Sequence, residues 1–90
     1  MSGYTIEFKQ RARKQLRKLP PSIQKQLKPA IDGLEENPLP EGCVKIKGVK
    51  KSLSTRWRIR IGNYRVVYTI YQDDRVVEIL DVQDRKDVYR

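Results

Sequence analysis

The residues best suited to chemistry are three arginines, Arg58, Arg60 and Arg65, which flank the dipeptide Gly62-Asn63. This dipeptide is typical of a two-residue hairpin turn. If it forms the loop, Arg60 pairs with Arg65, and the three arginines share one face of a sheet because side chains alternate along a strand. The other face then carries the apolar residues Trp57, Ile59, Ile61, Tyr64, Val66 and Tyr68.

Arginines placed in this way repel one another, because like charges directly opposed on a sheet destabilise it. At about 6 Å the repulsion is about 0.7 kcal/mol in water and about 3 kcal/mol at an effective dielectric of about 20. An anion between the guanidiniums relieves this repulsion, and guanidinium forks match phosphate oxygens in pairs. A single arginine is explained without a ligand, because its stem can lie over apolar surface while its guanidinium stays in water. Three arginines on one face favour a phosphate site.

The residue types that the sequence lacks limit the reactions that it could catalyse. The chain has no histidine and one cysteine, Cys43, around which no metal-ligand spacing exists. We expect Cys43 to be packed or half-exposed, and we expect no metal and no cofactor. Arginine is a poor base but a good stabiliser of negative charge in a transition state. RNA carries its own nucleophile, the 2′-hydroxyl, so this set of residues suits RNA cleavage better than DNA cleavage.

The charge and length of the chain indicate a small protein that binds polyanions. The 90 residues carry a net charge of +9 and a sequence pI near 9.9, which favours nucleic acid, an anionic surface or an acidic protein. No acid occurs between Glu41 and Asp73. One domain over residues 1–90 is expected. The absence of a signal core or a long apolar run predicts a cytoplasmic protein without membrane contact.

The N-terminal third predicts a strand followed by two helices. Alternating apolar residues predict the strand over residues 4–8. From Lys9 the apolar residues recur with helical spacing, and Pro20-Pro21 ends this helix because proline lacks a backbone donor and restricts the residue before it. Ser22 is a candidate cap for a second amphipathic helix, in which Pro29 predicts a kink or a break.

Alternation predicts four further strands, over residues 44–47, 56–61, 64–71 and 75–82. The predicted fold is α+β, with a small antiparallel-dominated sheet (β-α-α-β-β-β-β) packed against an N-terminal helical hairpin. Continued pairing through a second turn at Asp73-Asp74 would place Asp81 on the apolar face. A bulge or a different turn length is therefore expected in the second hairpin.

An ordered set of segments over nearly the whole chain resembles the RelE/ParE toxin superfamily, on the RelE side. The segments are Tyr4–Phe8, Arg17–Pro20, Asn37-Pro38, Lys45–Gly48, Trp57–Tyr68 and Arg85–Arg90. The resemblance implies the toxin of a type II toxin–antitoxin system. Such a toxin cleaves mRNA in the ribosomal A site by 2′-hydroxyl attack, independently of metal, and leaves a 2′,3′-cyclic phosphate and a 5′-hydroxyl.

The resemblance also implies roles for individual residues. Arg65 matches a phosphate-stabilising arginine, Arg85 a second catalytic arginine, and Tyr89 a tyrosine that orients or stacks on the substrate. Arg58 and Arg60 occupy catalytic positions where the best-known branch has lysines, one of them proposed as the general base. Arginine does not readily lose its proton, so the base is left open between the ribosome, Tyr89 and no strong base. The expected RNA and ribosome contacts are Lys45, Lys47, Lys50, Lys51 and Arg56.

The implied partners are the ribosome with its mRNA and a cognate antitoxin, whose acidic or helical segment would cover the basic face. Operator DNA is expected only through the antitoxin complex. Two other functions stay open. One is a ParE-type poison of DNA gyrase, which would not need the set of arginines with Tyr89. The other is a non-catalytic nucleic-acid-binding toxin remnant, in which the arginines serve only charge attraction.

Overall fold

The computed structural model describes residues 3–46 and 55–84. Its elements follow the predicted β-α-α-β-β-β-β order, with one 3₁₀ turn added, and the α+β class is confirmed. They are β1 (Thr5–Phe8), α1 (Gln10–Arg17), α2 (Pro21–Asp32), η1 (Gly33–Glu35), β2 (Val44–Lys45), β3 (Arg56–Ile61), β4 (Tyr64–Tyr71) and β5 (Val76–Asp84). In the described part of the chain, no helix is long and apolar enough to cross a membrane.

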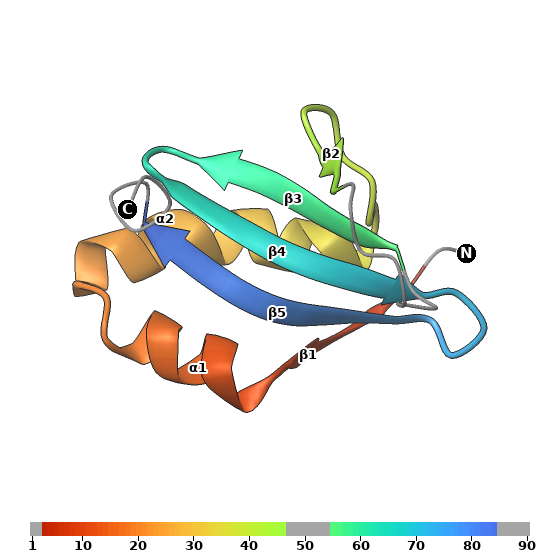
Figure 1. Ribbon diagram of the computed structural model, residues 1–90, viewed down its shortest axis with the longest axis horizontal. Coiled ribbons are helices and arrows are strands. Elements are labelled where there is room, and N and C mark those ends of the chain that lie inside the picture. The colour runs from red at the N-terminus through yellow and green to blue at the C-terminus, as the bar shows by residue number, and fades with distance from the viewer. Residues whose placement is uncertain (1–2, 47–54, 85–90) are drawn as a thin grey trace.

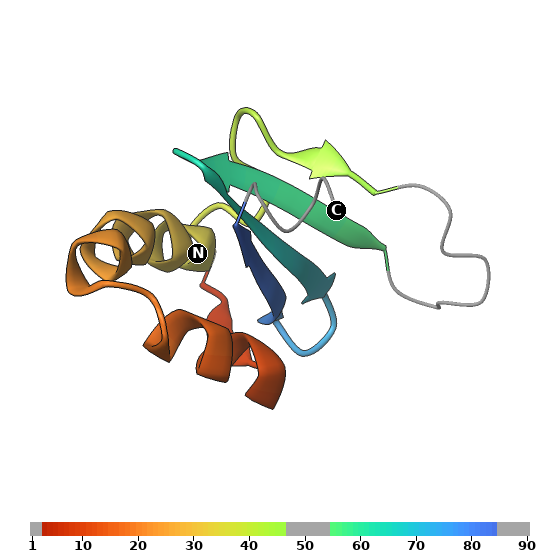
Figure 2. The ribbon, with the colours of Figure 1, turned by 60° about the vertical axis from the view of Figure 1, so that its left-hand side comes forward.

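The strands form one sheet in the order β1-β5-β4-β3-β2, in which β2 to β5 are antiparallel neighbours. Strand β1 pairs in parallel with β5, the last strand of the chain. Figure 1 shows α2 behind the sheet and α1 beside β5 and β1. Figure 2, turned by 60°, shows both helices on the side of the sheet away from β2. One face of the sheet is thus covered by α2, and the opposite face is called the open face below.

The predicted register of the first hairpin is confirmed. Ile61 pairs with Tyr64 and Arg60 pairs with Arg65 across the loop Gly62-Asn63. Gly62 has a positive φ of 60°, a conformation that glycine adopts without steric cost. The turn therefore fixes which side chains of β3 and β4 share a face.

The second hairpin contains the irregularity that the sequence predicted. Val67 pairs with Asp81, whereas the next residue, Tyr68, pairs with Ile79. Leu80 is therefore an extra residue on β5, a β-bulge that reverses the facing of the side chains beyond it. The bulge places Asp81 on the face of its partner Val67, away from the apolar face.

The second helix differs from the predicted one in its cap and in having no break at Pro29. The helix begins at Pro21 with Pro20 as its N-cap, so Ser22 lies inside the helix and does not cap it. Proline suits the first helical position because its missing N–H would lack a partner there in any case. The helix also continues through Pro29 without a break. Pro29 and Lys25, whose carbonyl loses its usual partner, are both exposed, so water can bind that carbonyl.

The core lies between the two helices and the covered face of the sheet. Helix residues and alternate strand residues meet there, as the hydrophobic spacing predicted. The buried cluster consists of Ala12, Leu27, Ile31, Leu34, Ile59, Val66, Tyr68, Val77, Ile79 and Val82. Trp57, Ile61 and Tyr64 pack against it while half-buried. The apolar face predicted for the first hairpin is therefore confirmed.

Candidate functional site on the open face of the sheet

The open face of the sheet carries a groove with a volume of about 410 Å³. Its walls come from the start of α1, from β3, β4 and β5, and from the residue after β2, so the fold assembles it from segments far apart in the sequence. The lining residues are Lys9, Arg11, Ile46, Arg56, Arg58, Arg65, Val67, Leu80, Asp81 and Gln83.

Three of the cations in the groove come from β3 and β4. Arg56 and Arg58 point to the open face because they alternate with the core residues of β3, and Arg65 joins them across the hairpin. Arg58 and Arg65 are half-buried, and Arg56 is exposed. Arg60 lies directly opposite Arg65, but it is exposed and lies outside the lining of the groove.

Two further cations, Lys9 and Arg11, enter the groove from the other side. From the sequence alone they were assigned no role, because nothing in the local pattern indicates that α1 runs along β5. The misfit of Asp81 was the signal that could have led to them. Once a bulge puts Asp81 on the open face, a cation is expected beside it.

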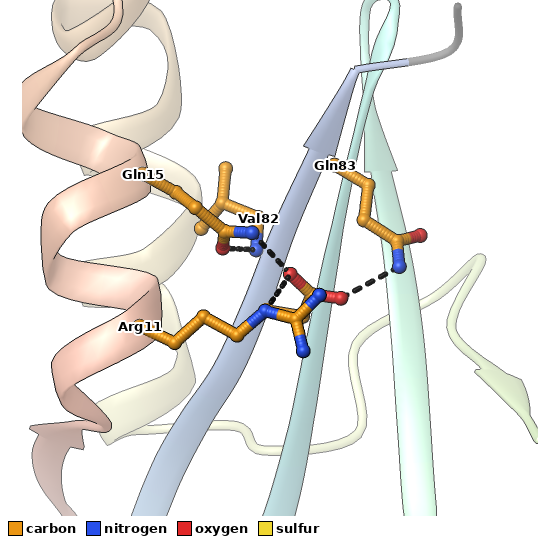
Figure 3. A network of polar contacts seen from close by, with 5 residues as sticks. Arg11, Gln15, Val82 and Gln83 are labelled. Atoms are coloured by element: carbon orange, nitrogen blue, oxygen red, sulfur yellow. Dashed lines mark hydrogen bonds and ion pairs between the residues drawn. The ribbon is translucent and has the colours of Figure 1, made fainter. Parts of the chain in front are cut away.

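Asp81 is the centre of a polar network between α1 and β5, and Figure 3 shows its partners Arg11, Gln15 and Gln83. The side-chain amide of Gln15 donates to Asp81 Oδ1 at 2.6 Å, and that of Gln83 donates to Oδ2 at 2.6 Å. Arg11 Nε lies 3.6 Å from Oδ1. The carboxyl side chain is only 15% exposed, whereas that of Arg11 is 73% exposed. Two amides thus fix the carboxylate, and Arg11 reaches it from solvent.

Gln15 also closes an edge of the sheet. Strand β1 pairs with β5 only as far as Ile79, so the backbone of β5 beyond that point faces α1. The Val82 N–H donates to Gln15 Oε1 at 2.7 Å, and the amide nitrogen of the same side chain binds Asp81. One glutamine therefore satisfies a backbone donor that a neighbouring strand would otherwise bind.

Of the remaining residues predicted for the site, the structure describes only Lys45, and it does not bring Lys45 to this groove. Lys45 pairs with Trp57 on β3, so it shares a face with the core residues of that strand and lies opposite to the groove. It is exposed there. The other predicted residues lie outside the described part of the chain, namely Lys47, Lys50, Lys51, Arg85 and Tyr89.

Tyr68 and Cys43 lie away from the groove. The Tyr68 hydroxyl donates to the Pro38 carbonyl oxygen at 2.7 Å. Burial raises the pKa of Tyr68 far above its ordinary value, and Cys43 adds to this effect. Cys43 itself is half-exposed and packs against the core, as the sequence predicted. Tyr68 is therefore a structural residue that stays protonated at neutral pH.

The chemical character of the groove follows from its lining. Five cationic side chains and one carboxylate surround a floor in which Val67, Ile46 and Leu80 are apolar. Guanidinium groups bind phosphate oxygens in pairs, and a cationic groove with an apolar floor can follow the backbone of a single-stranded nucleic acid. The arrangement offers charge stabilisation at a phosphate.

Comparison with known proteins identifies relatives that match nearly the whole chain. A family model described as the ParE toxin of the type II toxin–antitoxin system parDE matches residues 6–89. The chain is 37% identical to the putative toxin RelE1 of Methanocaldococcus jannaschii, covering 97% of this chain and 96% of that one. It is 36% identical to toxin RelG of Mycobacterium tuberculosis, covering 97% of each chain. It is 31% identical to the mRNA interferase toxin RelE of Escherichia coli, covering 97% and 90%.

Solved structures agree in fold. The RelE–RelB complex of Pyrococcus horikoshii matches with a TM-score of 0.78 at 28% identity, covering 94% of this chain and 97% of that one. The toxin–antitoxin complex RelBE2 of Mycobacterium tuberculosis matches with a TM-score of 0.78 at 31% identity, covering 92% and 99%. The chain belongs to the RelE/ParE superfamily of type II toxin–antitoxin toxins, and it is RelE-like.

Proposed function

We propose that the protein is a ribosome-dependent endoribonuclease that cleaves mRNA in the A site and so inhibits translation. The observation that carries the proposal is the groove, in which Arg56, Arg58 and Arg65 converge on one open sheet face. Relatives with 31% identity bear the name mRNA interferase. The ribosome as target implies the cytoplasm as the place of action.

In the proposed reaction the 2′-hydroxyl of the RNA attacks the adjacent phosphorus, and the bond from phosphorus to the 5′-oxygen breaks. The 2′-proton passes to a base, and a proton is delivered to the departing 5′-oxygen. Arg65 and Arg58 bind the phosphate oxygens, where negative charge grows in the transition state. By family resemblance we assign Arg85 to the leaving oxygen and Tyr89 to substrate orientation. Because the arginines are poor bases, alignment by the ribosome contributes much of the rate.

We further propose that the cationic groove is covered by a cognate antitoxin between periods of activity. Solved relatives include toxin–antitoxin complexes, in which the toxin is paired with a RelB protein. An antitoxin with an acidic or helical segment over the open face would neutralise Arg56, Arg58 and Arg65. Contact with operator DNA would then occur through the antitoxin complex.

Cell-free translation combined with primer extension tests the proposal. We expect new mRNA ends within codons when toxin and ribosomes are both present, and little cleavage of the same RNA without ribosomes. The 3′ fragment should carry a 5′-hydroxyl. Intact mRNA in the complete system, or rapid cleavage of naked RNA, would contradict the proposal.

A second function, poisoning of DNA gyrase, is favoured by one observation, the ParE description of the matching family model. A supercoiling assay with purified gyrase separates the two functions. Inhibition of supercoiling together with intact mRNA would establish that the protein poisons gyrase. Ribosome-dependent cleavage with normal supercoiling would establish that it is an mRNA-cleaving toxin.

A further inference from the structure

The cationic side chains of the groove form two groups. One group comes from β3 and β4, and contains Arg56, Arg58 and Arg65. The other contains Lys9, directly before α1, and Arg11 in its first turn. Val67 and Leu80 lie in the lining with them. The resemblance to known toxins assigned no role to Lys9 or Arg11, so the α1 group has no assigned function.

The contact between Arg11 and Asp81 is unsuited to a purely stabilising role. Arg11 is 73% exposed and its Nε lies 3.6 Å from the carboxylate, and an ion pair with so exposed a cation is weakened by water and contributes little to stability. Asp81 does not depend on Arg11, because Gln15 and Gln83 already donate to both of its oxygens. The pair therefore does more to orient Arg11 than to hold the fold together.

A carboxylate beside a phosphate-binding surface weakens the attraction for RNA unless it organises a cation there. Asp81 is fixed on the open face by the bulge at Leu80 and by two amide donors. It can therefore hold the long and otherwise mobile side chain of Arg11 over the groove, which lowers the entropy lost when Arg11 binds a ligand.

We propose that Lys9 and Arg11 form a second phosphate-binding position for single-stranded RNA, and that Asp81 is a positioning residue which holds Arg11 toward it. The RNA backbone would then cross the open face from the arginines of β3 and β4 to α1, with a base over Val67 and Leu80. The inference rests on the proposed function only in taking RNA as the ligand.

Binding of a short, fluorescently labelled single-stranded RNA to the purified full chain tests the proposal without the ribosome. The RNA carries 2′-O-methyl groups, so that it has no nucleophile and stays intact. Arg11→Ala is compared with Arg13→Ala, which removes the same charge from an exposed residue of α1 outside the groove. Because Arg11 and Arg13 are two residues apart on a helix, their side chains point in nearly opposite directions.

We expect Arg11→Ala to weaken RNA binding about fivefold or more and Arg13→Ala to weaken it less than about twofold. The slope of log affinity against log salt should fall by about 0.7 for Arg11→Ala, the loss of one phosphate contact on a single strand. Arg11→Lys should restore the slope. Lys9→Ala should behave like Arg11→Ala when compared with Lys25→Ala, an exposed lysine of α2.

A double-mutant cycle with Asp81→Asn isolates the positioning role. If Asp81 holds Arg11 in place, Arg11→Ala costs less affinity in the Asp81→Asn background than in the wild type. Equal losses in the two backgrounds would overturn the role of Asp81. Thermal unfolding of each variant shows that the compared proteins are equally folded.

The outcomes separate this inference from the proposed function. Equal RNA binding by Arg11→Ala and Arg13→Ala would overturn the second phosphate position, even if ribosome-dependent cleavage occurs. A specific loss for Arg11→Ala would support it, even if the translation assay shows no cleavage. No measurable binding of the wild-type chain to RNA at low salt would also overturn it.

Discussion

The two faces of the sheet differ in the polarity of their side chains, because successive residues of a strand point to opposite faces. On β3 and β4, Ile59, Val66 and Tyr68 lie in the core. Arg58 directly precedes Ile59 and Arg65 directly precedes Val66, and both arginines lie on the open face. Successive residues of one strand therefore serve different ends. The covered face provides the free energy of folding, and the open face concentrates positive charge that folding does not require.

This difference explains why the open face tolerates an unfavourable arrangement. Arg60 and Arg65 are direct cross-strand neighbours, and like charges in such positions destabilise a sheet. The core on the other face makes up for that cost. Substitutions on the two faces should therefore separate activity from stability, and each prediction below tests that separation.

The largest expected effect is that of Arg65→Ala on mRNA cleavage. Removing one group that stabilises transition-state charge typically lowers the rate about 10²- to 10³-fold. Stability should be unchanged or slightly higher, because the repulsion with Arg60 is removed. Cleavage by the variant in cell-free translation and its thermal unfolding are the two measurements.

Arg13→Ala is the matched control for this prediction, since it removes the same charge from an exposed helix position. It should keep cleavage within about twofold of the wild type. Full cleavage by well-folded Arg65→Ala would refute the role assigned to Arg65. Arg85→Ala is expected to abolish cleavage in the same assay.

The opposite outcome is expected on the covered face. Leu27 is fully buried on α2, and Leu→Ala substitutions in a core destabilise by about 2–5 kcal/mol. Chemical denaturation should show this loss, while RNA affinity of the folded fraction stays at the wild-type value. A selective loss of RNA binding at wild-type stability would break the separation between the faces.

The first hairpin and its two faces could be predicted because the information is local. Gly62-Asn63 fixes the loop, and alternation then assigns every side chain of β3 and β4 to a face. The same logic predicted a bulge or a different turn length in the second hairpin, since Asp81 could not belong on the apolar face, and the structure shows the bulge. The sequence could thus place Arg58 and Arg65 together, and the structure confirms that placement.

The other side of the groove could not be predicted because it depends on contacts between distant segments. The parallel pairing of β1 with β5 and the position of α1 along β5 leave no local pattern in the chain. Lys9 and Arg11 therefore looked like solvated helix residues. The break predicted at Pro29 does not occur, because on an exposed side of a helix water can bind the carbonyl that loses its partner.

Gln15 links α1 to β5 at the edge of the sheet. Its substitution should lower the free energy of unfolding by an intermediate amount. Gln15→Ala leaves the Val82 N–H without its acceptor and removes one of the two amide donors to the Asp81 carboxylate. The expected loss is about 1–3 kcal/mol. Amide hydrogen exchange at Val82 should accelerate by more than at Ile79. Gln10→Ala, at an exposed position of α1, is the control and should change neither quantity.

The smallest expected effect is that of Tyr68→Phe, which changes only a hydroxyl on the covered face. Loss of the hydrogen bond to the Pro38 carbonyl should cost about 1 kcal/mol at neutral pH. Because the pKa of Tyr68 is raised in the folded state, its protonated form contributes stability that is complete below about pH 10 and is lost at higher pH.

The stability difference between wild type and Tyr68→Phe should therefore shrink as the pH rises from neutral to about pH 11, because only the wild type carries this titration. Denaturant unfolding at several pH values measures the difference directly, and changes shared by both proteins cancel. RNA affinity should be equal in the two proteins at neutral pH, since Tyr68 lies on the face away from the groove. A constant difference across this range would show that Tyr68 is not held protonated by the core.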